Sequence, residues 1–236
     1  MATDSSPVLD PARMIAEARR AFFTMFALLC AVWAVQLANW ADDYRLTVDY
    51  GIVAHRPSRL ADVLAAPFLH VNWQHLEGNS GPLFIFGFLA AYRGVKKFLG
   101  LTLLVALTSG AAVWLFERDH VVTVGASGVI FGYFGYVVLR GLFDRNLIDS
   151  LIGLVMGASF AYLLTTAVPG TPGVSWLAHL GGLVGGLAGA WLFRDRTRTR
   201  GAAATAPAAV TAPAAAPGSA DPDRAQLLKE LDDLGL

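Results

Sequence analysis

The stretch VSWLAHLGGLVGGLAGAWLF, residues Val174–Phe193, contains a single ionisable residue, His179. A helix of twenty residues rises about 30 Å, which is close to the thickness of the hydrocarbon core of a bilayer. Its glycines recur at four-residue spacing, in rows that let helices approach closely in lipid. Because an imidazole inside an apolar span is costly, it indicates a functional role. The stretch therefore predicts a membrane helix that carries a functional histidine.

The whole chain has the composition of a membrane protein. Of its 236 residues 55% are hydrophobic and only 15% are charged, and the mean hydropathy is +0.52. Soluble domains carry about 25% charged residues, so these values argue against a soluble enzyme. The formal net charge is zero, and the Trp and Phe residues lie in apolar runs without Lys or Arg stripes, so no nucleic-acid partner is expected. The lone cysteine, Cys30, lies inside the first apolar run and is interpreted as a small packing residue.

Apolar segments of sufficient length recur along residues 21–193. We therefore expect an all-α integral membrane protein, a bundle of six transmembrane helices in one multi-pass domain. A cleaved signal peptide is disfavoured for the first segment, because its apolar stretch is too long and no small-residue cleavage site follows. The six segments are Ala21–Trp40, Leu69–Tyr92, Phe98–Phe116, Val121–Leu139, Leu147–Val168 and Val174–Phe193.

The basic residues predict the orientation of the bundle. With the N-terminus inside, twelve of the Lys and Arg residues near the span ends fall on the inner side and four fall on the outer side. Because cytoplasmic loops carry an excess of Lys and Arg, both termini are expected in the cytoplasm. The high Ala, Gly and Arg content suggests a GC-rich bacterium, so the expected location is a bacterial plasma membrane.

Three segments lie outside the predicted spans. Residues 1–20 form a cytoplasmic N-terminal segment, and residues 41–68 form a long outer connection that we expect to lie partly in the membrane interface. Residues 194–236 form a basic, Ala/Pro-rich cytoplasmic tail, extended to about residue 219. Four leucines then follow at helical spacing, where we expect a frayed amphipathic end rather than a docking helix. These are Leu227, Leu228, Leu231 and Leu234.

Polar residues inside the spans gather near one face of the membrane. They lie near the starts of the second, fourth and sixth spans, which all run from outside to inside in the predicted orientation. A helix from Ser127 to Arg140 would be about 21 Å long, about 10 Å short of a full span, so Ser127 is expected below the outer surface. The polar residues are His70, His75, Asn79, Ser127 and His179.

Small residues predict a close approach of the fourth and sixth spans. Gly182 and Gly186 share a helix face with His179. The fourth span offers Gly128, Gly132 and Gly135. Rows of small residues bring helix backbones together in lipid. Ser127 and His179, which lie at the starts of these two rows, are therefore expected to lie close together.

These residue types suit acyl transfer. A serine hydroxyl becomes nucleophilic when a base takes its proton, and histidine is the usual base near neutral pH, so Ser127 and His179 are the candidate pair. No aspartate is positioned as an obvious third member, so we expect a dyad. His75 and Asn79 lie four residues apart on one helix face and, with the backbone N–H of Ser127, could stabilise an oxyanion.

Together these motifs resemble those of the rhomboid family of intramembrane serine proteases. The motifs are His70-x4-His75-x3-Asn79, Gly125-Ala126-Ser127-Gly128, and Ala178-His179 followed by Gly182 and Gly186. The resemblance covers Ala21 to Phe193. It implies that Ser127 is the nucleophile, His179 the base, and His75 and Asn79 the oxyanion donors.

The resemblance also assigns supporting positions. His70 corresponds to a structural position at the mouth of the site, and Phe131 occupies the place where the family often has a Tyr stacked on the base. Gly125 and Gly128 flank the nucleophile. One departure is in the outer connection, where many members carry a Trp-Arg pair and this chain reads Ala61-Asp62.

For function, the resemblance implies a serine-type endopeptidase that cleaves single-span membrane proteins next to a small residue, where their helix unwinds near the outer face. No cofactor or metal is expected, and the sequence does not determine the oligomeric state.

Two other functions remain as alternatives. A non-catalytic rhomboid-like protein that binds transmembrane clients is disfavoured because both Ser127 and His179 are present. A transporter is disfavoured because the polar groups stop at one leaflet, without carboxylates in the inner half that would continue a path. A metal site at His70 and His75 is also disfavoured, since residues five apart do not share a helix face and no HExxH motif exists.

Overall fold

The computed structural model describes residues 10–195 and residue 233. The chain divides into two compact units, Met1–Thr199 and Arg200–Leu236, and only the first is described below. The predicted linker and amphipathic end of the tail lie outside the described residues.

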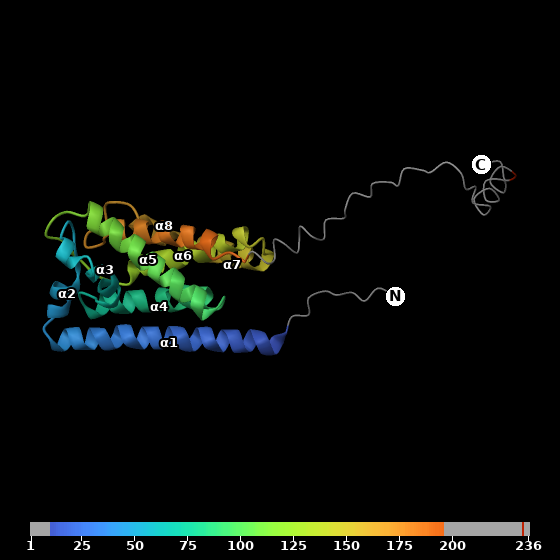
Figure 1. Cartoon of the computed structure of the whole chain (residues 1–236), viewed down its shortest axis with the longest axis horizontal. Helices are drawn as coiled ribbons and strands as arrows, with labels where there is room; N and C mark the ends of the chain where they lie inside the picture. The colour runs from blue at the N-terminus through green and yellow to red at the C-terminus, as the bar shows by residue number, and fades with distance from the viewer. Residues whose placement is uncertain (1–9, 196–232, 234–236) are drawn as a thin grey trace. The chain divides into compact units, whose positions relative to one another are not determined.

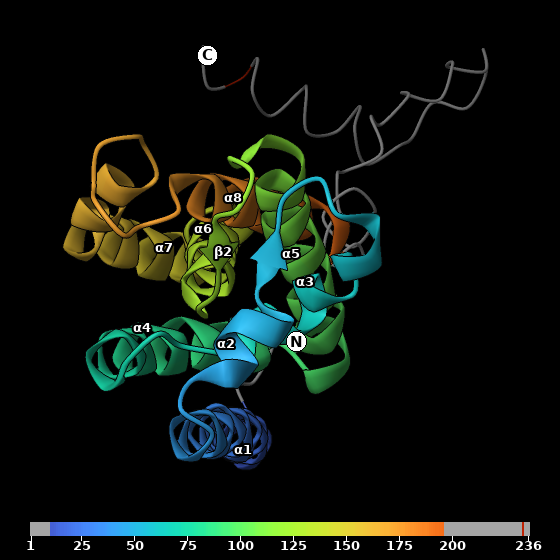
Figure 2. The same ribbon diagram turned by 90° about the vertical axis from the view of Figure 1, so that its left-hand side faces the viewer.

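The first unit is a bundle of helices, one for each predicted span (Figures 1 and 2). By length and composition, α1 and α5 could each cross a membrane, and α6, α7 and α8 are shorter apolar helices. The fold is therefore that of a mostly helical chain consistent with a membrane protein. The six helices are α1 (Pro11–Ala41), α4 (Trp73–Ala91), α5 (Val95–Phe116), α6 (Ser127–Phe143), α7 (Leu147–Ser159) and α8 (Trp176–Leu192).

Two helix boundaries differ from the predicted spans. The fourth span was expected from Val121, but α6 begins only at Ser127, because the residues from Val121 to Val124 are all β-branched and are a poor helix start. The fifth span was expected to reach Val168, but α7 ends at Ser159 and a 3₁₀ segment, Ala161–Thr166, follows. Thr165 and Thr166 donate their hydroxyls to backbone carbonyls three residues earlier, which favours the tighter turn over a continued α-helix.

The first helix begins earlier than its predicted apolar span. Asp10 caps it, accepting hydrogen bonds from the N–H groups of Ala12 at 3.0 Å and Arg13 at 3.3 Å, and Pro11 occupies the first turn. Half of the expected N-terminal segment is therefore helical and extends α1 beyond its apolar stretch.

The outer connection is ordered by short elements. These are α2 (Arg45–Tyr50), β1 (Ile52–Val53), a 3₁₀ turn at Pro57–Arg59, α3 (Asp62–Ala65) and a 3₁₀ turn at Ala66–Phe68. β1 pairs antiparallel with β2 (Val122–Thr123), a two-residue ladder that the all-α prediction missed. The outer connection departs from the family pattern at Ala61-Asp62. There Arg59 forms an ion pair with Asp62 and donates hydrogen bonds to the carbonyls of Val48 and Gly51, both at 3.0 Å.

The core surrounds α6, which contacts α4, α5, α7 and α8. Twelve of its seventeen residues are buried, among them Tyr133 and Tyr136. In contrast, α1 lies along one side of the bundle beside α4 (Figure 2). It exposes large apolar side chains, including Phe23 and Leu37. Such exposed apolar surface suits a helix that faces lipid.

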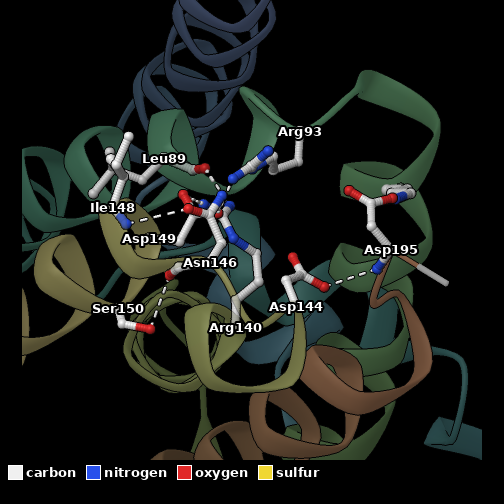
Figure 3. Close-up of polar contacts among 10 residues, drawn as sticks. Leu89, Arg93, Arg140, Asp144, Asn146, Ile148, Asp149, Ser150 and Asp195 are labelled. Atoms are coloured by element: carbon white, nitrogen blue, oxygen red, sulfur yellow. Dashed lines mark hydrogen bonds and ion pairs between the residues drawn. The ribbon is translucent and has the colours of Figure 1, made fainter. Parts of the chain in front are cut away.

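At one end of the bundle, buried charges tie several helices together (Figure 3). Asp149 of α7 forms an ion pair with Arg93, accepts a hydrogen bond from Arg140 of α6 at 2.7 Å, and accepts another from Asn146 at 2.7 Å. Arg140 also donates to the carbonyl of Leu89 at 3.2 Å. We call this end the charged end.

Asp149 corrects one step of the sequence interpretation. The transporter alternative was set aside partly because no carboxylate was expected in the inner half of the bundle, yet Asp149 is only 5% exposed at the charged end, which the predicted orientation places on the inner side. Its partners are the two arginines and the amide of Asn146, so the carboxylate is part of a structural ion network.

Candidate active site

A cavity of about 440 Å³ lies at the opposite end of the bundle, where α4, α6 and α8 begin. Residues that are distant in the sequence meet in its walls. Five of the residues expected at the site line it: His75, Asn79, Gly125, Ser127 and His179. The prediction that three spans bring their polar residues together is therefore confirmed.

Ser127 is the first residue of α6 and is half-buried in this cavity. The turn before it requires Gly125, whose φ of +122° is strained for any L side chain. A Cβ at Gly125 would also lie 2.7 Å from Cε1 of His75, so glycine lets the imidazole approach the backbone. The N–H of Gly125 donates to the carbonyl of Ala66 at 3.0 Å, which fixes the turn against the outer connection.

His179 lies in the first turn of α8 and is 5% exposed. Its Nδ1 lies 2.9 Å from the carbonyl oxygen of Thr166 and 3.1 Å from the hydroxyl oxygen of Thr166. A carbonyl can only accept, so Nδ1 carries the proton, and Nε2 keeps a lone pair. Phe131 stacks on the ring, with centroids 4.2 Å apart and planes 11° apart, as expected. The imidazole is thus held in the form that can accept a proton.

Glycines bring α6 and α8 into backbone contact. A Cβ on Gly182 would lie 1.9 Å from the carbonyl oxygen of Gly128, and a Cβ on Gly186 would lie 1.9 Å from that of Gly132. No side chain fits at either contact, so the predicted close approach of these helices is confirmed. The contact places the start of α6, with Ser127, beside the turn of α8 that carries His179.

The Ser127 hydroxyl and the imidazole line the same cavity, but within the described part of the chain no hydrogen bond joins them. Catalytic hydrogen bonds are often long in the free enzyme and tighten when substrate binds. The two side chains therefore face one cavity without a direct hydrogen bond between them.

His75 and Asn79 lie on one face of α4, as the four-residue spacing predicted. The Asn79 amide lies 3.0 Å from Nε2 of His70, and the rings of His70 and His75 are perpendicular, with centroids 4.9 Å apart. An amide nitrogen has two hydrogens, so Asn79 can donate one to His70 and keep the other for the cavity.

His70 does not lie where it was expected. It was placed at the mouth of the site, yet its side chain is fully buried and does not line the cavity. Its carbonyl accepts a hydrogen bond from the amide of Asn39 in α1 at 3.2 Å, and the same amide donates to Thr47 at 2.8 Å. His70 therefore accepts a hydrogen bond from Asn79 on the side away from the cavity. Through Asn39, the same polar cluster joins α1 to the site.

Sequence reasoning missed Thr166, Asn39 and Ser109. The hydroxyl of Ser109 in α5 donates to the carbonyl of Ala178 at 2.9 Å, next to His179, and its Oγ fills the space beside Gly128. Serine and threonine are common in membrane helices, and none of the three stands at a motif spacing. Nothing in the sequence distinguished them.

No metal-binding cluster of three or more His, Cys, Asp or Glu side chains occurs among residues 10–195.

Comparison with known proteins gives a family match. The model of the Rhomboid domain matches residues 57–196, which include every residue expected at the site. An uncharacterized protein of Mycobacterium tuberculosis is 34% identical over 180 residues, covering 72% of this chain and 73% of the relative.

Two further relatives carry protease names. The putative rhomboid protease YdcA of Bacillus subtilis is 31% identical over 121 residues, 50% of this chain and 59% of its own length. The rhomboid protease GlpG of Haemophilus influenzae is 23% identical over 192 residues, 77% of this chain and 93% of its own length.

Proposed function

Since this chain belongs to the rhomboid family, we propose that it is an intramembrane serine endopeptidase with a Ser127–His179 dyad. The observation that carries the proposal is the shared cavity: a serine and a histidine on two helices in backbone contact face it together with His75 and Asn79. Members of this family are integral membrane proteins that act on membrane-protein substrates.

In the first half-reaction, Ser127 Oγ forms a bond to the scissile carbonyl carbon while its proton moves to Nε2 of His179. The electron pair of the C=O π bond moves onto the oxygen, and the resulting oxyanion needs hydrogen-bond donors to stabilise it. His75, the free hydrogen of the Asn79 amide and the backbone N–H of Ser127 are the candidates, since the first N–H groups of a helix lack intrahelical partners. Collapse of this intermediate breaks the C–N bond, and the imidazolium returns its proton to the leaving amine.

In the second half-reaction, water attacks the ester on Ser127, and His179 Nε2 accepts its proton. The C–O bond to serine breaks, the serine oxygen takes the proton back, and the new carboxylic acid leaves. The contact between Nδ1 and the Thr166 carbonyl supports both steps, because it stabilises the imidazolium without becoming protonated itself. The stack with Phe131 keeps the ring plane fixed during both transfers.

We also propose six membrane-spanning helices, with both termini in the cytoplasm of a bacterium and the cavity opening toward the outer face. The excess of basic residues in the inner segments supports this orientation. The starts of α4, α6 and α8 lie at one end of the bundle, which would then be the outer end. A short α6 would hold Ser127 below the membrane surface.

The proposed substrates are single-span membrane proteins, cut next to a small residue. A carbonyl inside an intact helix is already hydrogen-bonded, so the substrate helix has to unwind locally before Ser127 can attack. A cavity of about 440 Å³ accommodates a few residues of extended chain rather than a whole helix.

Cleavage of a model transmembrane substrate in proteoliposomes tests the proposal. Ser127→Ala and His179→Ala should each abolish cleavage while the protein still inserts and folds. Ser80→Ala is the matched control, because Ser80 follows Asn79 on α4 but lies outside the cavity, with its hydroxyl bonded to the carbonyl of Leu76 at 2.8 Å. A client-binding protein without catalysis predicts no cleavage by the wild type and equal substrate capture by Ser127→Ala and the wild type.

A further inference from the structure

A second cavity lies at the charged end of the bundle, between the first turns of α1 and the turn that joins α4 to α5. Its volume is about 570 Å³. Five of its lining side chains are basic and two are acidic. The basic residues are Arg13, Arg20, Arg93, Lys96 and Lys97, and the acidic residues are Glu17 and Asp195. We call it the basic cleft.

The two acidic residues of the basic cleft are already paired. Glu17 accepts a hydrogen bond from Arg13 at 2.9 Å, and Asp195 forms an ion pair with Lys97. Arg20 and Lys96 form no ion pair with any described residue. The cleft therefore keeps an excess of positive charge after its own ion pairs are counted.

Arg93, which also lines the cleft, adds to this excess. Figure 3 shows it beside Asp149 and Arg140. Arg93 shares the carboxylate of Asp149 with Arg140, and Arg140 also lies near the buried carboxylate of Asp144, whereas Arg93 forms an ion pair with Asp149 alone among the described residues. Its Nε is buried and has no hydrogen-bond acceptor within the described part of the chain. Buried charges are normally compensated, and an anion in the cleft would complete the compensation.

The position of the cleft indicates the kind of anion. Arg20 immediately precedes the apolar stretch of α1, and Lys96 and Lys97 precede that of α5, so the cleft lies where two apolar helices begin. In a bilayer this is the depth at which the hydrocarbon core meets the phosphate groups of the lipids.

An apolar groove lies further along the same two helices. Its volume is about 210 Å³, and its walls include Leu28 and Val32 of α1 and Leu99 and Leu103 of α5. Leu28 is eight residues beyond Arg20, about 12 Å along the helix at 1.5 Å per residue. A ligand with a phosphate head and a hydrocarbon tail could use both features, whereas free phosphate could use only the cleft.

We infer that the basic cleft binds the headgroup of an anionic phospholipid, with an acyl chain directed along the α1–α5 groove. The site is separate from the cavity of Ser127 and does not depend on the proposed proteolysis. Basic clefts between membrane helices recognise anionic lipids through charge, and each Lys or Arg near the headgroup contributes about fivefold in affinity.

Native mass spectrometry of the full-length protein, titrated with phosphatidylglycerol or phosphatidylcholine of the same acyl chains, measures this binding. The wild type should bind phosphatidylglycerol more tightly. The double variant Arg20→Gln/Lys96→Gln should lose about 25-fold of that affinity, from about fivefold per cation. Both side chains are exposed and unpaired among the described residues, so the substitutions should leave the fold intact.

The matched control is Arg19→Gln/Arg145→Gln. It removes two exposed basic residues, one beside Arg20 on α1 and one in the turn after α6 at the charged end, and neither lines the cleft. This control should retain the wild-type affinity for phosphatidylglycerol. Equal losses in the two double variants would overturn the inference, because they would reflect the overall charge of the surface.

Two further arms identify the source of the phosphate. Inorganic phosphate and a short-chain phosphatidylglycerol, which cannot fill the α1–α5 groove, should both bind at least tenfold more weakly than the long-chain lipid. If inorganic phosphate binds as tightly as the long-chain lipid, the site takes a free phosphate group and the lipid assignment is wrong. If the short-chain lipid does, the α1–α5 groove does not hold an acyl chain and that part of the inference is overturned. These readouts are independent of protease activity, so they also distinguish failure of this inference from failure of the proposed function.

Discussion

The carbonyl oxygen of Gly128 lies 1.9 Å from the point where a Cβ of Gly182 would sit. This relationship joins α6 to α8 through their backbones, next to the two residues that are proposed to share a proton. Membrane helices gain little from burying apolar surface against one another, so close backbone contact is a principal source of their association. The geometry of the dyad therefore depends on two positions that carry no side chain.

Gly182→Ala should separate α6 from α8 at the site. The added methyl group meets backbone, which cannot rotate away, and overpacking of this kind typically costs about 1–3 kcal/mol. We expect a lower free energy of unfolding in mixed micelles and a loss of cleavage larger than the loss of folded protein. Gly78→Ala is the control, because nothing lies within 4 Å of a Cβ there, and it should be neutral. Equal behaviour of the two variants would show that the glycine contact does not position the dyad.

Asn79→Ala should reduce cleavage without unfolding the protein. Removal of one oxyanion donor typically costs about 2.7–4 kcal/mol, or about 10²–10³-fold in kcat. KM should change little, because the donor acts on charge that develops in the transition state. Steady-state kinetics with a transmembrane substrate measures both constants. An effect confined to KM would assign Asn79 to substrate binding instead.

Asp149→Asn should destabilise the charged end of the bundle. The substitution removes the carboxylate with which Arg93 and Arg140 both form ion pairs, and loss of one partner of a buried pair costs about 3–5 kcal/mol. The free energy of unfolding in mixed micelles measures this loss. Glu17→Gln removes a carboxylate from an exposed pair with Arg13 and should have no measurable effect. A small effect of Asp149→Asn would mean that the two arginines are compensated by another group.

The pair between His55 and Asp119 should make stability depend on pH. The Asp119 carboxylate lies 2.8 Å from Nδ1 of His55, and the Leu115 carbonyl lies 3.1 Å from Nε2, so both contacts raise the pKa of His55 above its ordinary value. Stabilisation from a raised pKa is complete below the unfolded value, about 6.5, and is lost as the pH rises through the folded value. The same hydrogen bond lowers the pKa of Asp119, whose contribution is lost only in stronger acid.

The variant His55→Asn tests this dependence, because Asn tolerates the φ of +57° found at this position. The difference in Tm between wild type and variant should be larger at pH 5.5 than at pH 8.5. A difference that stays constant, or grows with pH, would contradict the ion pair.

The sequence predicted the features that follow a fixed spacing. Apolar length predicted the positions of the helices, and the four-residue rows predicted the contact of Gly182 with Gly128. The helix considered from Ser127 onward, shorter than a full span, matches the observed start of α6. These predictions succeeded because each rests on the geometry of a single helix or on a pair of facing rows.

Other features depend on tertiary contacts that cannot be predicted from the spacing of residues in the sequence. Thr166 reaches His179 only because α7 stops early and a 3₁₀ segment turns its carbonyl toward the ring. Asn39 of α1 donates a hydrogen bond to the carbonyl of His70, which precedes α4. Asp149 of α7 forms an ion pair with Arg93, in the turn after α4. A short polar side chain in an apolar segment shows that a partner is needed, but its identity follows only from the fold.

Labelling with a fluorophosphonate probe, followed by mass spectrometry of the modified peptide, tests the central claim most directly. The proposed dyad predicts that the probe modifies Ser127, that Ser127→Ala abolishes labelling, that His179→Ala reduces it strongly, and that Ser80→Ala labels like the wild type. Labelling that persists in folded Ser127→Ala, or a wild-type protein that cleaves its substrate without reacting at Ser127, would contradict the account.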